Sequence, residues 1–411
     1  MINLSPRQLS KSARASRLAA MTQAAAQHWL RAHDQTSRTA DEGRPTPATI
    51  ERTPERAGRA SPGAGLWSNL HMGGSPDWLR FVPADVRGLV VSHVPPAFRP
   101  LDGQLGGGFS LPEGFVGDRF PTAGEAEIPD GAQFLSGSFS NEAGSRPYKL
   151  YVPSGYKGQP VPLVVMLHGC TQSPDDFAAG TRMNAVAEEQ TCLVVYPGQT
   201  AGAHPQKCWK WFSPEDQQRD SGEPSLIAGI TRQVMRDYAI DPARVYVAGM
   251  SAGGAAAAIM GKSYPDLYAA IGVHSGLACG AAHDLPSAMA AMQRGSGRPA
   301  SGKPQRIVPA IVFHGDRDKT VSPRNGEDVV EQATPATGSR IQVVRGEVPG
   351  GRNYTCTVHL DEAGHPLTEH WVIQGAGHAW SGGSAAGSYT DPQGPDASRE
   401  MLRFFQQHPR G

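Results

Sequence analysis

The chain has 411 residues, and its 38 Lys and Arg balance its 38 Asp and Glu, so a nucleic-acid-binding protein that relies on overall basic charge is not expected. Charged residues make up 18% and hydrophobic residues 39% of the chain, which argues against a wholly disordered polyelectrolyte. The 49 glycines and 35 prolines are compatible with several domains, or with one large domain behind a tail.

Residues 1–130 are predicted to form a basic, partly disordered N-terminal extension. Residues 1–30 carry apolar residues at helical spacing beside a basic stripe, which fits either a weak surface anchor or a solvated helix. Residues 35–130 are rich in Pro, Gly, Ser, Thr and Arg and are typical of a linker. No export signal and no transmembrane segment are recognised, so a cytoplasmic location is expected, or secretion if the true start differs.

From residue 131 to residue 411, runs typical of strands alternate with runs typical of helices. The expected strands are Tyr148–Val152, Leu163–Leu167, Leu193–Tyr196, Val245–Ala248, Ala270–His274, Ala310–His314, Gln342–Val344 and His370–Ile373. The expected helices are Asp175–Gln190, Pro224–Tyr238, Ala252–Ser263 and Asp396–Gln407. This alternation predicts one α/β domain with a mostly parallel central sheet and helices on both faces.

A candidate nucleophile lies in the sequence Gly-Met-Ser-Ala-Gly, between the strand that ends at Ala248 and the helix that begins at Ala252. The pattern G-x-S-x-G at such a junction is typical of a sharp turn that presents Ser251 at the carboxyl edge of the sheet. Small residues are needed two positions before and after the serine, and Gly249 and Gly253 meet that need. The N–H of Ala252 then lies at a helix N-terminus, where it can bind a developing oxyanion.

A serine nucleophile needs a histidine base and an orienting carboxylate, which follow it in this order in folds of this kind. Asp316 and Asp318 both follow the strand that ends at His314. Asp318 is preferred because it lies three residues past a glycine, as the acid does in comparable strand-end loops, and Asp316 is then a turn residue. His378 lies in a glycine-rich loop after the last predicted strand and is the predicted base.

The second oxyanion donor is expected in the loop after Leu167, where His168 and Gly169 precede Cys170. We assign the donor N–H to Cys170 and expect His168 to orient the loop; the alternative is that Cys170 is only a small buried residue. The remaining histidines near strands, His314 and His274, are interpreted as structural.

Five stretches together resemble the polyhydroxybutyrate (PHB) depolymerase family of serine esterases: LHGCTQSPDDFAAGTRMN, CWKWF, DPARVYVAGMSAGGAAAA, FHGDRDKTV and GAGHAWSGG. The resemblance spans residues 131–408. It implies an α/β-hydrolase fold and hydrolysis of short-chain polyester, with Ser251, Asp318 and His378 as the triad. The chain looks most similar to intracellular depolymerases with a secreted type of catalytic domain. The extension is then a candidate granule-targeting part.

The resemblance also bears on the five cysteines. In secreted relatives the positions of Cys170 and Cys208 are those of disulfide partners, and Cys279 and Cys356 are candidates for a second pair. In a reducing cytosol, five free thiols are expected instead. Cys192 lies in a strand pattern and is expected to be a core thiol.

Tryptophans near these motifs are candidates for an apolar substrate cleft. Trp209 and Trp380, together with His168, are the predicted substrate-binding residues, and Trp380 is the preferred one because it follows the base by two positions. Packing in the core is the alternative for each tryptophan, and Trp211 is expected to be the most buried.

The predicted function is hydrolysis of poly(3-hydroxybutyrate), related short-chain polyhydroxyalkanoates and their oligomers through an acyl-enzyme. The expected partner is a polyester substrate or granule surface, with no nucleic acid, and neither a metal nor an organic cofactor is required. One alternative is a feruloyl or acetyl-xylan esterase, because related domains cleave such esters. A second alternative is a non-catalytic granule-surface protein.

Overall fold

The computed structural model describes residues 128–296, 306–335 and 339–411. The helix expected over residues 1–30 lies outside the described residues, as does the expected linker up to residue 127. The boundary predicted near residue 131 falls shortly before the first described strand, β1, which begins at Gln133.

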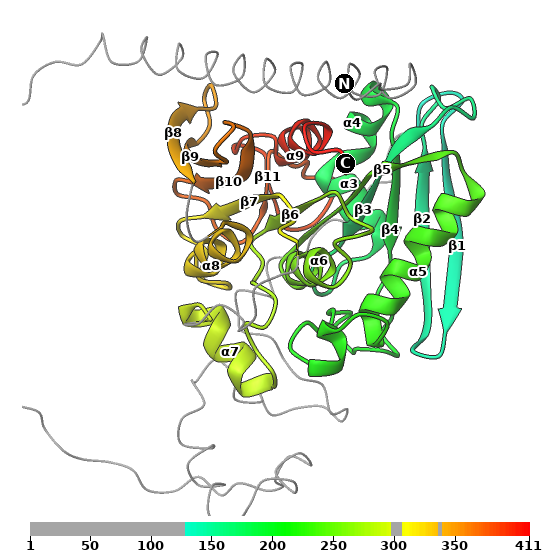
Figure 1. Ribbon diagram of the computed structural model, residues 1–411, viewed down its shortest axis with the longest axis horizontal. Coiled ribbons are helices and arrows are strands. Elements are labelled where there is room, and N and C mark those ends of the chain that lie inside the picture. The colour runs from blue at the N-terminus through cyan, green and yellow to red at the C-terminus, as the bar shows by residue number, and fades with distance from the viewer. Residues whose placement is uncertain (1–127, 297–305, 336–338) are drawn as a thin grey trace, which may run out of the picture. The chain divides into compact units, whose positions relative to one another are not determined.

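A ten-stranded sheet forms the centre of the described chain, in the order β1-β2-β4-β3-β5-β6-β7-β10-β9-β8 (Figure 1). The six middle strands run parallel to one another. These are β4 (Leu193–Pro197), β3 (Val161–Leu167), β5 (Ile240–Met250), β6 (Ala270–His274), β7 (Ala310–Gly315) and β10 (Pro366–Ile373). Strands β3, β4, β6 and β7 are buried along their whole length, which explains their nearly continuous apolar sequences.

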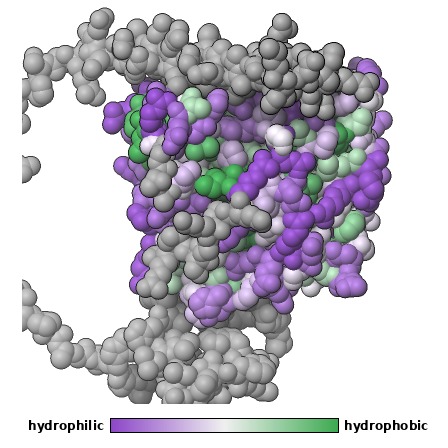
Figure 2. All heavy atoms as spheres, viewed as in Figure 1, coloured by the Kyte–Doolittle hydropathy of each residue, from purple (hydrophilic) through white to green (hydrophobic). Residues whose placement is uncertain are grey.

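Antiparallel strands flank this parallel core on both sides. They are β1 (Gln133–Asn141) and β2 (Gly144–Val152) at one edge, and β9 (Asn353–Leu360) and β8 (Arg340–Glu347) at the other. The outermost strand β8 exposes Ile341 and Val343 to solvent. Elsewhere on the face shown in Figure 2, polar side chains cover the course of α5.

Helices cover both faces of the sheet (Figure 1). One buried cluster includes residues of α5 (Gly222–Asp237), α6 (Ala252–Ser263), α7 (Leu285–Arg294) and α8 (Arg324–Ala333). The other includes residues of α3 (Pro174–Thr181), α4 (Met183–Gln190) and α9 (Ala397–Gln406). The predicted mostly parallel sheet with helices on both faces is therefore confirmed. No helix within the described residues is both long and apolar enough to cross a membrane.

Several details differ from the sequence-based prediction. The single helix expected over Asp175–Gln190 is wrong: Arg182 adopts a left-handed conformation, with φ of 56°, and divides it into α3 and α4. Strands β1 and β9 and helices α7 and α8 were not predicted. Among the other expected elements, β6 and α6 have the predicted bounds, and the rest are present with shifted ends.

Candidate active site

Ser251 occupies the junction between β5 and α6. Its backbone has φ of 56° and ψ of −121°, and its N–H donates to the carbonyl oxygen of His274 at 2.9 Å. A Cβ atom added to Gly249 would overlap the backbone of Gly253, and one added to Gly253 would overlap the carbonyl of Leu167. The glycines are therefore required because the turn brings β3, β5 and α6 too close together for side chains.

Asp318 and His378 meet at the same edge of the sheet, from the loops after β7 and β10. The Nδ1 of His378 donates to Oδ2 of Asp318 at 2.7 Å. The other carboxylate oxygen of Asp318 accepts from the backbone N–H groups of Thr320 at 2.8 Å and Val321 at 2.9 Å. This bonding fixes both the carboxylate and the tautomer of the imidazole, so the Nε2 of His378 is left as the basic nitrogen.

Asp316, the competing carboxylate, faces elsewhere. Its Oδ1 accepts from the N–H of Gly375 at 2.6 Å, and its own N–H donates to the carbonyl of Ile373 at 3.1 Å. Asp316 thus ties the loop after β7 to the loop after β10, and the structure places Asp318 rather than Asp316 against His378.

The charge state of Asp318 follows from two opposing effects. Burial alone raises the pKa of its carboxyl, but attraction to His378 and hydrogen bonds from His314 and His378 outweigh burial and hold the pKa well below its usual range. The side chain is completely buried, and the Nε2 of His314 lies 3.4 Å from Oδ2 of Asp318. Asp318 is therefore an anion throughout the neutral range.

His274 supports the serine from the neighbouring strand, as the prediction of a structural role implies. Its ring stacks between Phe313 and Trp380, with centroid distances of 5.7 and 5.0 Å. Its Nε2 accepts the N–H of Ser381 at 2.9 Å. Burial, with repulsion from nearby histidines, lowers the pKa of His274 to about 3, so this ring is neutral and acts as packing.

The loop after β3 is held beside Ser251 by its own polar groups. His168 donates through Nδ1 to the carbonyl of Gly169 at 2.7 Å, and the Gly169 N–H donates to the side chain of Gln172 at 3.0 Å. A Cβ atom on Gly169 would stand 3.5 Å from the Cβ of Ser251. The neighbouring N–H groups, of Thr171 and Gln172, bond to carbonyl oxygens, whereas that of Cys170 has no acceptor among the described residues.

His168, Trp209 and Trp380 are buried in the core and do not face solvent, as residues that line a substrate cleft would. His168 is 0% exposed, Trp209 is 0% exposed and Trp380 is 1% exposed, so the prediction that they bind substrate is wrong. The physical reason is bonding within the core: the indole of Trp209 donates to the carbonyl of His168 at 3.1 Å and that of Trp380 to Ser398 at 3.2 Å. Trp211, expected to be the most buried, is the least buried of the three, at 7%.

The cysteines divide into one disulfide and three thiols. Cys170 and Cys208 are bonded, with Cα atoms 4.2 Å apart, so the disulfide that the resemblance implied is present and the alternative of five free thiols is wrong. Cys279 and Cys356 are free and belong to different core clusters, so a second disulfide between them is excluded. Cys192 is a buried thiol, as predicted.

Sequence reasoning missed a hydroxyl pair beside the candidate oxyanion loop. The Oγ1 of Thr171, an exposed residue, lies 3.2 Å from the hydroxyl of Tyr389, which comes from the loop after His378. The backbone of Tyr389 is left-handed, with φ of 54°. In the sequence, the only signal for this hydroxyl pair was the position of Tyr389, eleven residues after His378. Within the described residues, no cluster of three His, Cys, Asp or Glu side chains is arranged to hold a metal.

A parallel sheet covered by helices, with Ser251, Asp318 and His378 following β5, β7 and β10 in this chain order, is typical of the α/β-hydrolase fold. Residues 146–340 match the family described as esterase PHB depolymerase.

The chain is also similar in sequence to individual esterases. The chain is 33% identical to poly(3-hydroxyalkanoate) depolymerase C of Paucimonas lemoignei over 252 residues, which cover 59% of this chain and 60% of that protein. It is 28% identical to poly(3-hydroxybutyrate) depolymerase of Ralstonia pickettii, over 54% of this chain and 48% of that protein. It is 27% identical to feruloyl esterase B of Neurospora crassa, over 65% of this chain and 89% of that protein. The chain thus spans about half to three fifths of the two depolymerases.

Proposed function

We propose that this protein is a serine esterase that hydrolyses poly(3-hydroxybutyrate), or related short-chain polyhydroxyalkanoates and their oligomers, through an acyl-enzyme. The observation that carries the proposal is the 2.7 Å hydrogen bond between His378 and Asp318, at the sheet edge where Ser251 stands on its strand-to-helix turn.

In the first half of the reaction, His378 accepts the proton of the Ser251 hydroxyl through Nε2 as the oxygen attacks the ester carbonyl. Asp318, bonded to Nδ1, stabilises the imidazolium that forms. The C–O bond of the ester then breaks, and the leaving alkoxide takes the proton from His378. The second half repeats these steps with water as nucleophile, which releases the acid and restores Ser251.

Negative charge on the carbonyl oxygen is stabilised by two N–H groups. Ala252 is the first residue of α6, so its N–H has no intrahelical acceptor, and the helix has no side-chain N-cap bond. The N–H of Cys170 approaches from the loop after β3, fixed by the disulfide to Cys208. Donors of this kind accelerate acyl transfer because they are already in place when charge develops.

The choice of polyester as substrate is supported by the family match over residues 146–340 and by the two depolymerase relatives. The test is hydrolysis of amorphous poly(3-hydroxybutyrate) granules by the full chain, with labelling by a serine-directed phosphonate mapped by mass spectrometry. We expect release of 3-hydroxybutyrate and labelling at Ser251. Ser251→Ala is expected to lower turnover by about 10⁴- to 10⁶-fold. Wild-type turnover by this variant would refute the assignment.

A feruloyl or acetyl-xylan esterase is the second candidate. The supporting observation is the match to feruloyl esterase B, which extends over 89% of that protein. Parallel assays on methyl ferulate, acetylated xylan and polyester granules distinguish the two proposals. Faster turnover of the ferulate or acetyl ester, with no granule hydrolysis, would favour the carbohydrate esterase.

The compartment is also a proposal. We infer that the protein works where disulfides persist, because bonds such as Cys170–Cys208 are rare in a reducing cytosol. This favours the secreted alternative over the expected cytoplasmic, granule-associated location. Mass spectrometry of thiol-blocked, non-reduced protein taken directly from its native cells is the test. Blocked Cys170 and Cys208 in most of the protein would restore the cytoplasmic interpretation.

A further inference from the structure

Glu223 is a buried carboxylate that the mechanism above does not use. It lies in the first turn of α5, where its side chain is only 6% exposed, and its Oε1 pairs with Nη2 of Arg146 at 3.2 Å. The same Oε1 accepts from the side-chain amide of Gln199, and Oε2 accepts the N–H of Lys210 at 2.7 Å. Burying a charge is unfavourable unless it is well bonded, and each oxygen of this carboxylate has a partner.

The hydrogen bonds of Glu223 hold the chain at Gln199, before Cys208, and at Lys210, after it. Lys210, two residues after Cys208, is held directly through its N–H. Gln199, bonded to the same carboxylate, donates at 3.0 Å to the carbonyl oxygen of Cys208 itself. Because Cys208 is covalently bonded to Cys170, the position of Glu223 is transmitted to the candidate oxyanion donor.

A second connection reaches the same loop by another route. The backbone N–H of Gln199 donates to Nε2 of His168 at 3.0 Å, and Nδ1 of His168 donates to the carbonyl of Gly169. The indole of Trp209 also bonds to the carbonyl of His168. Glu223 therefore acts on both ends of the segment 168–170, one end through Gln199 and His168 and the other through the disulfide.

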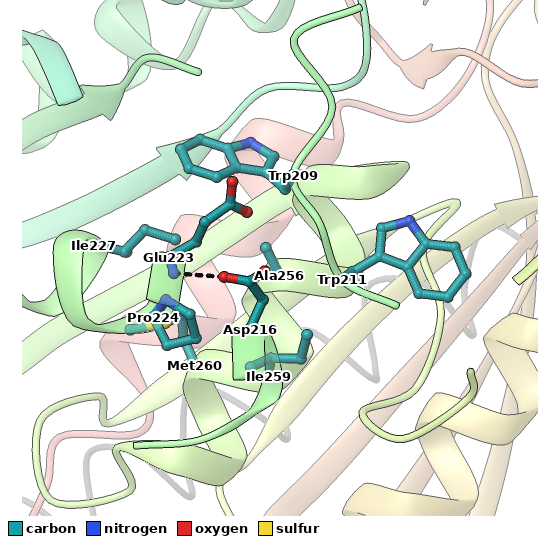
Figure 3. Close-up of a pocket in the computed structure, with 9 residues that line it drawn as sticks. All are labelled: Trp209, Trp211, Asp216, Glu223, Pro224, Ile227, Ala256, Ile259 and Met260. Carbon is teal, nitrogen blue, oxygen red and sulfur yellow. Dashed lines mark hydrogen bonds between the residues drawn. The ribbon is translucent and has the colours of Figure 1, made fainter. Parts of the chain in front are cut away.

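Figure 3 shows where this carboxylate lies: the side chain of Glu223 extends toward Trp209, at the wall of a small cavity. The N–H of Glu223 donates to Oδ1 of Asp216 at 2.7 Å, the bond drawn as a dashed line. Burial and the nearby Asp216 raise the pKa of Glu223. The rest of the cavity wall is mostly apolar, including Ile227 and Met260.

Stability alone is a weak explanation for such a cluster. Apolar residues of similar volume often replace buried ion pairs with no loss of stability. The bonds of Glu223 lead to the loop beside Ser251, which points to a role in arranging the site.

We propose that Glu223 is a positioning residue, which holds the N–H of Cys170 at the place where negative charge develops on the substrate carbonyl. The inference rests on the proposed function. It implies that loss of the charge impairs stabilisation of the transition state more than binding of the substrate.

The test compares Glu223→Gln with Glu369→Gln in the full chain. Glu369 is a matched control because it is also a buried carboxylate, 1% exposed, paired with Arg403 at 2.5 Å and bonded to the indole of Trp371. For each protein, kcat and KM on p-nitrophenyl butyrate, the phosphonate labelling rate of Ser251 and the melting temperature are measured.

We expect Glu223→Gln to lower kcat by about 10- to 100-fold, less than or comparable to removal of a whole oxyanion donor, with KM changed by less than about threefold. The rate of phosphonate labelling should fall by a similar factor. Glu369→Gln should lower the melting temperature while kcat stays within about threefold of wild type. Equal kcat for Glu223→Gln and wild type overturns the inference.

Two further outcomes are decisive. If wild-type protein neither hydrolyses esters nor labels at Ser251, the proposed function fails, whereas an active wild type with an unimpaired Glu223→Gln refutes this inference alone. If Glu223→Gln does not fold, Gln199→Met is measured, and its kcat must fall at least fivefold at constant KM. Failure of both variants to fold while Glu369→Gln folds overturns the inference in favour of a purely structural role.

Discussion

Asp316 and Asp318 are two residues apart, yet they bond to different parts of the chain. Asp318 accepts hydrogen bonds from Nδ1–H of His378 and from two backbone N–H groups, whereas Asp316 accepts one from the N–H of Gly375. The difference arises because the loop turns back after Gly315, so that the Asp318 N–H donates to the carbonyl of Gly315. Only one of the two carboxylates is therefore in a position to orient the imidazole.

Asp318→Asn is expected to lower kcat by about 10³- to 10⁴-fold, because an amide no longer fixes the tautomer or stabilises the imidazolium. Asp316→Asn keeps an acceptor oxygen for Gly375 and should stay within about threefold of wild type. Steady-state kinetics on a soluble ester measure both. A larger loss for Asp316→Asn would exchange the roles assigned to the two carboxylates.

Much of the site was predictable at the residue scale, and the exceptions have a common cause. Gly249 and Gly253 signalled the turn because no other residue fits there, and the order of Ser251, Asp318 and His378 followed from the fold. The roles of Trp209 and Trp380 were mispredicted because a sequence does not show which way an aromatic ring faces. The Glu223 network was missed because its members come from β2, the loop after β4 and α5, and share no motif.

At the scale of elements, the disulfide joins the loop after β3 to the segment that precedes α5. It closes a loop of 38 residues by sequence separation, and one of its ends is the candidate oxyanion donor Cys170. Cross-links that close such loops stabilise proteins by about 2–4 kcal/mol, mainly through the unfolded state.

Replacing both cysteines, as Cys170→Ala with Cys208→Ala, is expected to lower the free energy of unfolding by about 2–4 kcal/mol. A loosened loop should also reduce kcat, by about tenfold if one oxyanion donor is only partly displaced. Urea titration and steady-state kinetics measure the two effects. Cys192→Ala, which removes a buried thiol from the opposite face, is the control and should leave kcat unchanged; unchanged kcat in the double variant would show that the loop is held without the disulfide.

The elements themselves were predicted unevenly. The parallel strands were recognisable as apolar runs because helices cover both of their faces. Strand β9 was missed although Tyr354, Cys356, Val358 and Leu360 alternate with less buried residues. Helix α8 was missed because two of its buried residues, Asn325 and Asp328, are polar. The boundary between α3 and α4 depends on the left-handed backbone of Arg182, for which no glycine or asparagine gives a signal.

At the scale of the whole molecule, buried histidines link stability to pH. Burial lowers the pKa to about 4 in His168 and His370 and to about 3 in His274. In the unfolded chain these histidines have a pKa of about 6.5. Below that pH the unfolded state therefore binds protons that the folded state does not bind. Their contribution to stability is complete above pH 6.5 and is lost as the pH falls toward 4.

We therefore expect the free energy of unfolding to fall between pH 6.5 and 4, by about 1.4 kcal/mol per pH unit for each such histidine. Asp318 adds to this loss at lower pH, because its pKa is below the value of about 3.9 in unfolded chains. Urea titrations across this range give the slope. His370→Leu, a variant outside the site, should reduce the slope by about one proton, and an unchanged slope would mean that His370 is protonated in the folded protein.

The proposed division of the chain at residue 131 is tested by shortening it. Strand β1 pairs with β2 along its full length, from Gln133 to Asn141, so the ten-stranded sheet is contained in residues 131–411. A chain that begins at residue 131 is expected to hydrolyse a soluble short-chain ester within about threefold of the full chain, the limit used for the neutral variants above. If the extension is an anchor, only hydrolysis of granules should decline; equal loss on both substrates would make the extension part of the fold.

The backbone conformation of Ser251 has a consequence for the stability of the protein. With φ of 56° and ψ of −121°, it occupies a region that glycine adopts without steric hindrance, and a residue with a side chain is destabilised there by about 1–3 kcal/mol. Ser251→Gly should therefore melt at a higher temperature than Ser251→Ala, since only the former relieves the strain, although both lack the hydroxyl. Calorimetry of the two inactive variants measures the difference, and a lower melting temperature for the glycine variant would contradict it. The backbone conformation at position 251 is thus unfavourable for the residue that we propose as the nucleophile.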